Sequence, residues 1–314
     1  MTKKSAGPSS QKNETRQTYW LKQTTTKSLS LRLSRLQPEE LLWSAIVWAV
    51  AALVTAALLW LLSDVFWHGI GQISWEFVTM PPSNAGRDGG IAPIIVSTSL
   101  IVGVCMAVSM PLGVGTALLL AEFSSSSSVL ARLVRLSLDI LAGVPSIVFG
   151  LFGNALFCKT LGMGFSILSG GLTLACMVLP TLIRSTQEGF RSVPNDYRRS
   201  AAALGISRPA ILWELLLPAA MPGVVVGLLL GLGRALCETA ALIFTSGYVD
   251  RMPESLLDSG RSLSVHIYDL AMNVSGGEPH AYASALVLVV FLVLINAAIS
   301  WLAERFQQSK IFVV

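Results

Sequence analysis

The chain has 314 residues, of which 53% are hydrophobic and 13% are charged, with a formal net charge of +4. Soluble domains carry roughly a quarter charged residues, so a fraction this low excludes an ordinary water-soluble fold and points to lipid as the solvent. The small positive excess is explained by an uneven distribution of basic residues across a membrane, and it does not indicate a nucleic-acid-binding protein. The composition predicts a membrane protein.

Stretches long enough to cross a bilayer follow one another along the chain. A transmembrane helix needs about 20 apolar residues, and a helix satisfies its own backbone polar groups in lipid. Five stretches contain no Lys, Arg, Asp or Glu, and a sixth is interrupted only by Arg234 and Glu238. The predicted spans are residues 41–62, 91–121, 140–158, 160–183, 215–249 and 281–303. We therefore expect an all-α polytopic membrane protein of six transmembrane helices.

Proline residues divide and bend these spans. We expect a bend at Pro111, a third span that carries Pro145, a fourth span that ends near Pro180, and a fifth that begins around Pro218 to Pro222. Proline inside a span is tolerated where neighbouring helices or polar groups satisfy the freed carbonyl groups. Helices that bend around a pathway fit this pattern, and so does ordinary kinked packing.

Lys and Arg are distributed unevenly between the two sides of the predicted membrane. Residues 1–40 hold eight of them, and all segments on that side together hold 17 of the 22. The opposite side has four, and Arg234 lies within a span. Because cytoplasmic segments are enriched in Lys and Arg, both termini are predicted to be cytosolic. Residues 1–40 then form a cytosolic N-terminal arm, and residues 41–314 form the transmembrane domain.

The predicted cytosolic loop 184–214 contains helical signals of its own. Residues 200–204 are good helix formers, and Gly205 follows them at the position of a C-terminal cap. Ser207 then precedes Pro209, which suits a second helix with Ser207 at its N-cap and a proline in its first turn. We expect a moving partner to bind a short helix–turn–helix on this face.

The same loop resembles a pattern of the binding-protein-dependent ABC permeases. In that family Glu-Ala-Ala is followed by Gly and then, at a fixed spacing, by an aliphatic residue and Leu-Pro. The residues at these positions here are Arg199, Ser200, Ala201, Gly205, Leu215, Leu217 and Pro218. The resemblance implies that loop 184–214 contains the coupling helix, which docks on a separate ATPase subunit, with Arg199 in place of the usual glutamate.

Further stretches resemble one branch of that family, the phosphate permeases of the PstA type. They run in the expected order over residues 85–303 and comprise Gly89-Gly90-Ile91, Pro111 to Val114, Ala121-Glu122-Phe123, Pro145 to Phe152, Pro180 to Arg184 and Arg234 to Thr239. Cys237 stands where the last of these usually has glycine. The resemblance implies the MetI-like permease fold of type I ABC importers, with its core over residues 85–303.

Function and partners are also implied by this resemblance. A PstA-type subunit forms half of a phosphate pathway in the bacterial inner membrane, beside a second, PstC-like permease. An ATPase subunit dimer binds on the cytosolic side, and a phosphate-binding protein delivers the ligand outside. The chain has no Gly-x-x-x-x-Gly-Lys-Ser/Thr phosphate loop. We therefore expect a transport subunit without its own ATPase site or cofactor, and ATP use by the partner.

Arg234 and Glu238 are the candidate pathway residues on physical grounds. A charge at mid-membrane costs a few kcal/mol, so it normally faces a cavity or a partner. Four residues apart on a helix, the two side chains share one face and can pair. A guanidinium presents a planar fork of donors to an oxyanion such as phosphate. A structural ion pair between helices is the alternative. Arg184, at the end of the fourth span, is either a second station or an interfacial arginine.

Gly223, Gly227 and Gly231 form a stripe of small residues at fourfold spacing in the fifth span. Such a stripe lets two helices approach closely. The second helix belongs either to this chain or to a second permease subunit.

Chemistry other than transport has little support in the sequence. No paired carboxylates and no nucleophile with a base occur within the spans, and the three histidines and four cysteines have no metal-ligand spacing. No catalytic residue and no metal site are therefore predicted. The alternatives that remain are a permease of the same build for another oxyanion, such as sulfate or molybdate, and a secondary transporter that needs no ATPase.

Overall fold

The computed structural model describes residues 38–123 and 128–311, so the predicted N-terminal arm lies almost wholly outside the described residues. Five of the described helices are long and apolar enough to cross a membrane, and a sixth span results if one bent helix pair is counted as a span. The predicted all-α, six-span architecture is confirmed. Within the described residues the strands form one antiparallel pair of two residues each, β1 (Pro82–Ser83) and β2 (Asp88–Gly89).

Some of the α-helices continue directly into short 3-10 or π segments, and the connection from α11 to α12 is a long irregular one. In chain order they are α2 (Pro38–Ile70), α3 (Trp75–Thr79), α4 (Ala92–Leu118), α5 (Val129–Gly143), α6 (Ser146–Gly153), α7 (Ile167–Ser192), α8 (Asn195–Ala203), α9 (Arg208–Ala210), α10 (Leu217–Leu236), α11 (Ala240–Ile243), α12 (Leu263–Met272) and α13 (Glu278–Ile311). The remaining segments are η1 (Asn84–Gly86), η2 (Leu119–Phe123), η3 (Asn154–Thr160) and η4 (Ile211–Leu216).

Helix α2 is described by itself, because the chain divides into a segment up to Ser63 and a segment from Asp64. No glycine or proline interrupts it between Pro38 and Gly69, which explains why it runs beyond the predicted span 41–62. Every side chain from Leu42 to Ser63 is exposed, although the helix is strongly apolar. A helix with this surface needs lipid or another protein around it.

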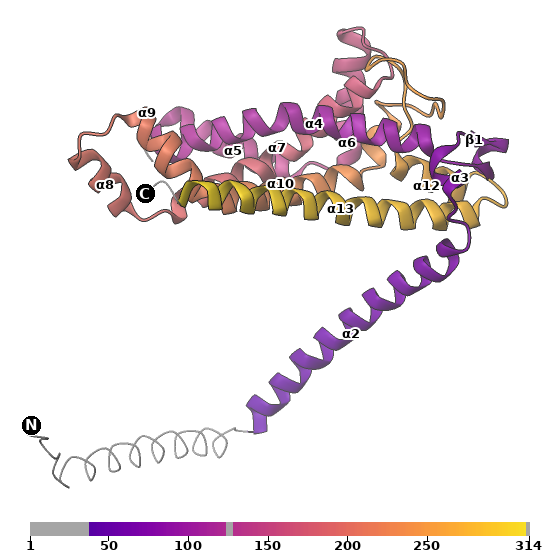
Figure 1. Ribbon diagram of the computed structural model, residues 1–314, viewed down its shortest axis with the longest axis horizontal. Helices are drawn as coiled ribbons and strands as arrows, with labels where there is room; N and C mark the ends of the chain where they lie inside the picture. Colours follow the sequence, from indigo (N-terminus) through magenta and orange to yellow (C-terminus); the bar gives the residue numbers. More distant parts are fainter. Residues whose placement is uncertain (1–37, 124–127, 312–314) are drawn as a thin grey trace, which may run out of the picture. The chain divides into compact units, whose positions relative to one another are not determined.

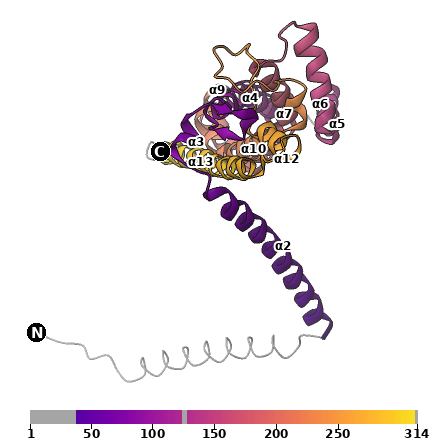
Figure 2. The ribbon, with the colours of Figure 1, turned by 90° about the vertical axis from the view of Figure 1, so that its right-hand side faces the viewer.

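The segment from Asp64 forms a bundle in which α4, α7, α10 and α13 run side by side (Figure 1), seen end-on in Figure 2. Helix α7 is its central member, with 67% of its most apolar window buried, against 44% for α4 and 33% for α10. Its core includes Ile101, Cys105, Phe149, Leu174, Val178, Ala235 and Val265. Helix α8 lies at one end of the bundle, here called the α8 end, and α12 lies at the opposite end, the α12 end (Figure 1).

The third predicted span, 140–158, is not a single helix. Its residues belong to α5 and to the continuous run of α6 and η3, and the two helices meet at an angle of 106°. The break falls at Val144 and Pro145, both of which have extended backbone angles. A residue before proline disfavours the helical region, and proline lacks the donor that a continuing helix needs. The α6–η3 run, in pink, stands across the direction of the long helices (Figure 1).

The fourth span begins and ends later than predicted, over Ile167–Ser192 instead of 160–183. Pro180 lies inside α7, and the helix continues to Ser192, so the expectation that it ends near Pro180 is wrong. The lost backbone hydrogen bond is tolerated because α7 is packed on both sides of the proline. Val178 lies against Gly231 of α10, and Leu182 lies against Gly113 of α4. Residues 184–192 are therefore part of a span and not of the predicted loop.

The fifth span begins earlier and ends earlier than predicted. Its helix runs without interruption from Arg208 through η4 into α10, so Pro218 and Pro222 lie within it. Helix α10 ends at Leu236, with Cys237 at its C-cap, and the short helix α11 begins at Ala240. The predicted span continues to 249, but residues 237–249 form turns, irregular backbone and the short helix α11 instead of a continued span.

Candidate functional site

Arg234 lies in the last turn of α10, close to the end of the fifth span. Its side chain is exposed on the surface of the chain. Within the described part of the chain, it takes part in none of the ion pairs and side-chain hydrogen bonds. Its charge is therefore directed away from the chain's own packing and is available to water, an anion or another subunit.

Glu238 does not pair with Arg234, and the expectation that both lie on one helical face is wrong. Helix α10 ends at Leu236, so the fourfold spacing no longer brings the two side chains together. The carboxylate Oε1 of Glu238 instead accepts a hydrogen bond of 3.2 Å from the backbone N–H of Ala241, in the first turn of α11. A carboxylate at this position satisfies a free N–H and interacts favourably with the helix dipole.

Arg184 of α7 forms an ion pair with Asp139 of α5, which the sequence alone did not single out. Both side chains are about half exposed, at 49% and 65%, so their mutual attraction is weakened by solvent. The positive charge of Arg184 is compensated locally, whereas that of Arg234 is not.

The positions of Arg184 and Arg234 along the bundle follow from the contacts between α7 and α10. Gly189 lies against Gly223, and Val178 lies against Gly231, so the two helices run antiparallel. At about 1.5 Å per residue, Arg184 and Arg234 lie roughly 13 Å apart along the bundle axis. The structure therefore does not bring these two arginines into one site.

The glycine stripe of α10 faces α7 within this chain. A Cβ added to Gly223 would lie 2.4 Å from the Cα of Gly189, and one added to Gly231 would lie 2.5 Å from Cγ1 of Val178. Gly227 similarly lies against Leu182. The hydroxyl of Ser185 donates a hydrogen bond of 2.8 Å to the carbonyl of Gly223. These contacts hold α7 and α10 in close backbone approach.

The segment between α7 and α10 contains α8 and α9, and α9 continues without a break into the fifth span. Residues 195–210 are called the hook below. Helix α8 ends at Ala203, and Gly205 has a φ of +73°, a backbone angle that favours glycine. Ser207 is the N-cap of α9, and Pro209 lies in its first turn. The hook is exposed at the α8 end of the bundle (Figure 1).

The seven residues of the family pattern are distributed over the hook and the start of the fifth span. Arg199 and Ser200 are exposed on α8, whereas Ala201 is buried against the bundle. Leu215 lies in η4, and Leu217 and Pro218 open α10, all three partly buried. Large apolar side chains on and beside the hook are also exposed, although no motif in the sequence marks them: Tyr197, Leu204, Ile206 and Trp213.

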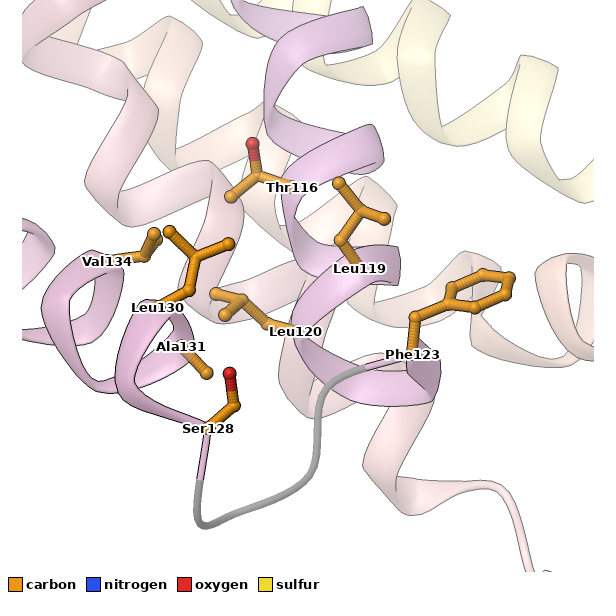
Figure 3. Close-up of a pocket in the computed structure, with 8 residues that line it drawn as sticks. All are labelled: Thr116, Leu119, Leu120, Phe123, Ser128, Leu130, Ala131 and Val134. Atoms are coloured by element: carbon orange, nitrogen blue, oxygen red, sulfur yellow. The ribbon is translucent and has the colours of Figure 1, made fainter.

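A cavity of about 570 Å³ opens between the end of α4 and the start of α5 (Figure 3). Its lining is formed by Thr116, Leu119, Leu120, Phe123, Ser128, Leu130, Ala131 and Val134. Two hydroxyl groups are the only polar side-chain groups among these residues, and none of the residues is charged. The cavity therefore offers no cation for an oxyanion.

Comparison with known proteins identifies the chain's relatives. Residues 109–311 match the family described as "Binding-protein-dependent transport system inner membrane component". The chain is 33% identical to the probable ABC transporter permease protein YqgI of Bacillus subtilis, over 82% of this chain and 93% of that protein. It is 31% identical to the phosphate transport system permease protein PstA 2 of Mycobacterium bovis, over 85% of this chain and 89% of that protein.

A solved structure has the same fold. It is a bacterial alginate ABC transporter in complex with an alginate pentasaccharide-bound periplasmic protein, with a TM-score of 0.60 at 16% identity, over 85% of this chain and 98% of the matched chain. At that identity the likeness concerns the fold alone, which is the permease fold of type I ABC importers. With the family match covering 109–311 and relatives above 30% identity over most of the chain, this protein belongs to the family of binding-protein-dependent transport system inner membrane components.

Proposed function

We propose that this chain is the permease subunit of an ATP-driven phosphate importer and forms half of its transmembrane pathway. The observation that carries the proposal is the exposed side chain of Arg234, which has no ion-pair partner among the described residues although it lies in an apolar span. A charge at this position is costly in lipid, so it is retained where it meets water, an anion or another subunit. Similarity to a protein named as a phosphate permease supports phosphate as the anion.

The guanidinium of Arg234 replaces part of the hydration that phosphate loses on its way through the membrane. Its planar donors match two oxygens of an oxyanion at once. Glu238, held at the break after α10 by the N–H of Ala241, places a fixed negative charge nearby in sequence. That charge limits how tightly the anion is held, so that the anion also leaves. Arg184, which is exposed although it is paired with Asp139, is a second position at which the anion binds on the same path.

Orientation follows from the basic residues of the α8 end. Arg191, Arg198, Arg199 and Arg208 lie on or beside the hook, and cytoplasmic segments are enriched in such residues. We therefore assign the α8 end and both termini to the cytosol, and the α12 end to the external side of the bacterial inner membrane.

The hook is the site of coupling to a separate ATPase subunit dimer. Tyr197, Leu204 and Trp213 expose 50%, 78% and 64% of their surface at this end, which suits a partner that covers apolar side chains. A PstC-like second permease completes the pathway. A phosphate-binding protein docks on the α12 end. The alginate transporter of similar fold was likewise solved in complex with a periplasmic protein. ATP is bound by the ATPase, and this chain holds no cofactor and no ATPase site of its own.

The test is phosphate transport by the assembled complex in proteoliposomes. Phosphate-loaded binding protein should stimulate ATP hydrolysis and phosphate uptake, and Arg234→Gln should abolish uptake while the subunits still co-purify. Arg251→Gln removes an exposed arginine from the 246–262 connection and serves as the matched control. Normal uptake in Arg234→Gln contradicts the role of this arginine. Stimulation by sulfate or molybdate instead of phosphate identifies another oxyanion, and transport by the chain alone under an ion gradient identifies a secondary transporter.

A further inference from the structure

Helix α8 is attached to the bundle by very few side chains. Of its nine residues, seven are exposed, Ala201 is buried, and Arg198 is partly buried. Ala201 contributes one methyl group to this contact, so Arg198 is the only long side chain of α8 that is directed into the rest of the protein. Force applied to α8 reaches the bundle either along the backbone or through Arg198.

The guanidinium of Arg198 joins two other elements at the α8 end. Its Nη2 lies 2.5 Å from Oε1 of Glu122, and its Nε lies 3.1 and 3.2 Å from the two carboxylate oxygens, which makes a bidentate ion pair. Its Nη1 donates to the carbonyl of Val193 at 2.8 Å, and Nη2 donates to the carbonyl of Phe190 at 2.9 Å. The side chains of Arg198 and Glu122 are only 25% and 13% exposed.

These partners belong to elements that continue into the membrane. Glu122 lies in η2, which extends α4, and Phe190 lies in the last turn of α7. Phe190 and Val193 are buried with Leu216 and Ala220 of the fifth span, and Leu118 and Ala121 of the α4 end pack against them. Arg198 therefore lies where the ends of α4, α7 and the fifth span meet.

A bidentate arginine pair transmits displacement better than a single contact. The guanidinium is planar and rigid, and its donors here engage a carboxylate and two carbonyl groups at once. Rotation of α8 about any one of these bonds would break the others. Partial burial also keeps water from competing for the same donors.

We propose that Arg198 is the positioning residue through which movement of α8 reaches the ends of α4 and α7. The inference rests on the proposed function, because the proposed ATPase is what moves α8. From α7 the displacement passes to α10 through the close contact of Gly189 with Gly223 and of Val178 with Gly231. Helix α10 carries Arg234 in its last turn. The hook and the proposed anion site are thus connected by one chain of packed contacts.

The experiment measures phosphate transported per ATP hydrolysed by the complete complex in proteoliposomes. The variants are Arg198→Gln, Arg198→Lys, Glu122→Gln and the double variant Arg198→Gln with Glu122→Gln. Arg191→Gln removes an exposed arginine from the last turn of α7 and is the matched control. Co-purification of the ATPase and the rate of ATP hydrolysis without binding protein report on assembly.

We expect Arg198→Gln to assemble and hydrolyse ATP as the wild type does, while phosphate transported per ATP falls at least tenfold. Glu122→Gln should lower the ratio less, because the bonds to the two carbonyl groups remain. Arg198→Lys should keep part of the wild-type ratio of phosphate transported per ATP. The double variant should have the same ratio as Arg198→Gln, because both changes remove the same interaction. Arg191→Gln should keep the wild-type ratio.

An unchanged ratio of phosphate transported per ATP in Arg198→Gln overturns the inference. The inference is also overturned if Arg198→Gln and Glu122→Gln both lose transport only in proportion to the ATPase lost from the complex. If the wild-type complex transports sulfate or molybdate and not phosphate, the proposed function fails in its substrate. The same ratio measured with that anion then still tests Arg198.

Discussion

The hydroxyl of Ser264, in the first turn of α12, donates a hydrogen bond of 2.6 Å to the backbone carbonyl of Glu238, at the break between α10 and α11. The same hydroxyl lies 2.9 Å from Oγ of Ser262, which caps α12 by accepting from the N–H of Val265. Helix α12 is tied in turn to α4, because the N–H of Leu263 donates to Oγ1 of Thr98 at 2.9 Å. The break that follows Arg234 is therefore held by α12, which is itself tied to α4.

Ser264→Ala should lower the stability of the permease. The change leaves the carbonyl of Glu238 without its donor, and an unsatisfied buried polar group costs about 1–3 kcal/mol. The apparent Tm of the purified complex measures the loss, and phosphate uptake should fall with it because Glu238 loses its fixed position. Ser275→Ala, at an exposed position, is the control. Equal Tm values for the two variants would show that this hydrogen bond is not what holds the break.

Gly223→Ala should destabilise the contact between α7 and α10. The new Cβ would lie 2.4 Å from the Cα of Gly189 and 2.8 Å from the carbonyl oxygen of Ser185. Both are backbone atoms, so the helices must separate, and overpacking of this kind costs roughly 1–3 kcal/mol or more. Gly103→Ala, in α4, is the matched control, since its Cβ would meet no atom within 4 Å. A thermal shift of the same size and sign in both variants would contradict the close approach.

The features predictable from the sequence are those set by local pattern. The apolar spans follow from the length of charge-free sequence, and five of them are helices in the structure. The turn in the hook was also visible, because a glycine after a run of helix formers marks a left-handed cap, and Gly205 has a φ of +73°. Local composition was sufficient because no partner far along the chain is needed for either feature.

The features that could not be predicted depend on residues far apart in the sequence. Pro145 ends a helix and Pro180 does not, and only the packing of α7 between α4 and α10 distinguishes them. The partners of Arg184 and Arg198 lie 45 and 76 residues away, so no helical spacing indicates them. The sequence places Glu238 on the same helical face as Arg234 because hydropathy cannot show where inside a long apolar stretch a helix stops.

Arg184→Gln should have a milder effect than Arg234→Gln. The ion pair with Asp139 is about half exposed, and exposed pairs contribute about 0–1 kcal/mol, so the Tm of the complex should change little. As a second station, Arg184 should affect uptake chiefly by raising the KM for phosphate-loaded binding protein, with less effect on the maximal rate. Asp139→Asn keeps the arginine and removes its partner, and it should not raise the KM. An unchanged KM in Arg184→Gln would leave this arginine with an interfacial role alone.

His266 is a buried histidine at the α12 end, where it is 1% exposed. Burial lowers its pKa from the ordinary 6.5 to about 3, and the positive charge of Arg261 adds to the effect, against the opposing charge of Asp269. His280 lowers it slightly further. Arg261 also lies 3.4 Å from Nδ1 of the imidazole, and it is paired with Asp269 at 3.2 Å. The folded protein therefore keeps His266 neutral at pH values where the unfolded chain protonates it.

The free energy of unfolding should consequently fall as the pH is lowered from about 6.5 towards 3, because over this range His266 binds a proton in the unfolded state and not in the folded state. At pH 5 the loss from this group is roughly 2 kcal/mol relative to neutral pH. The change in apparent Tm of the purified complex between about pH 7.5 and about pH 5 measures this loss. His266→Gln removes the titrating group and keeps an acceptor for Arg261, so its Tm should fall less over this interval. His68→Gln, at an exposed histidine of α2, should follow the wild type, and an identical acid dependence in all three proteins would assign the loss to other groups.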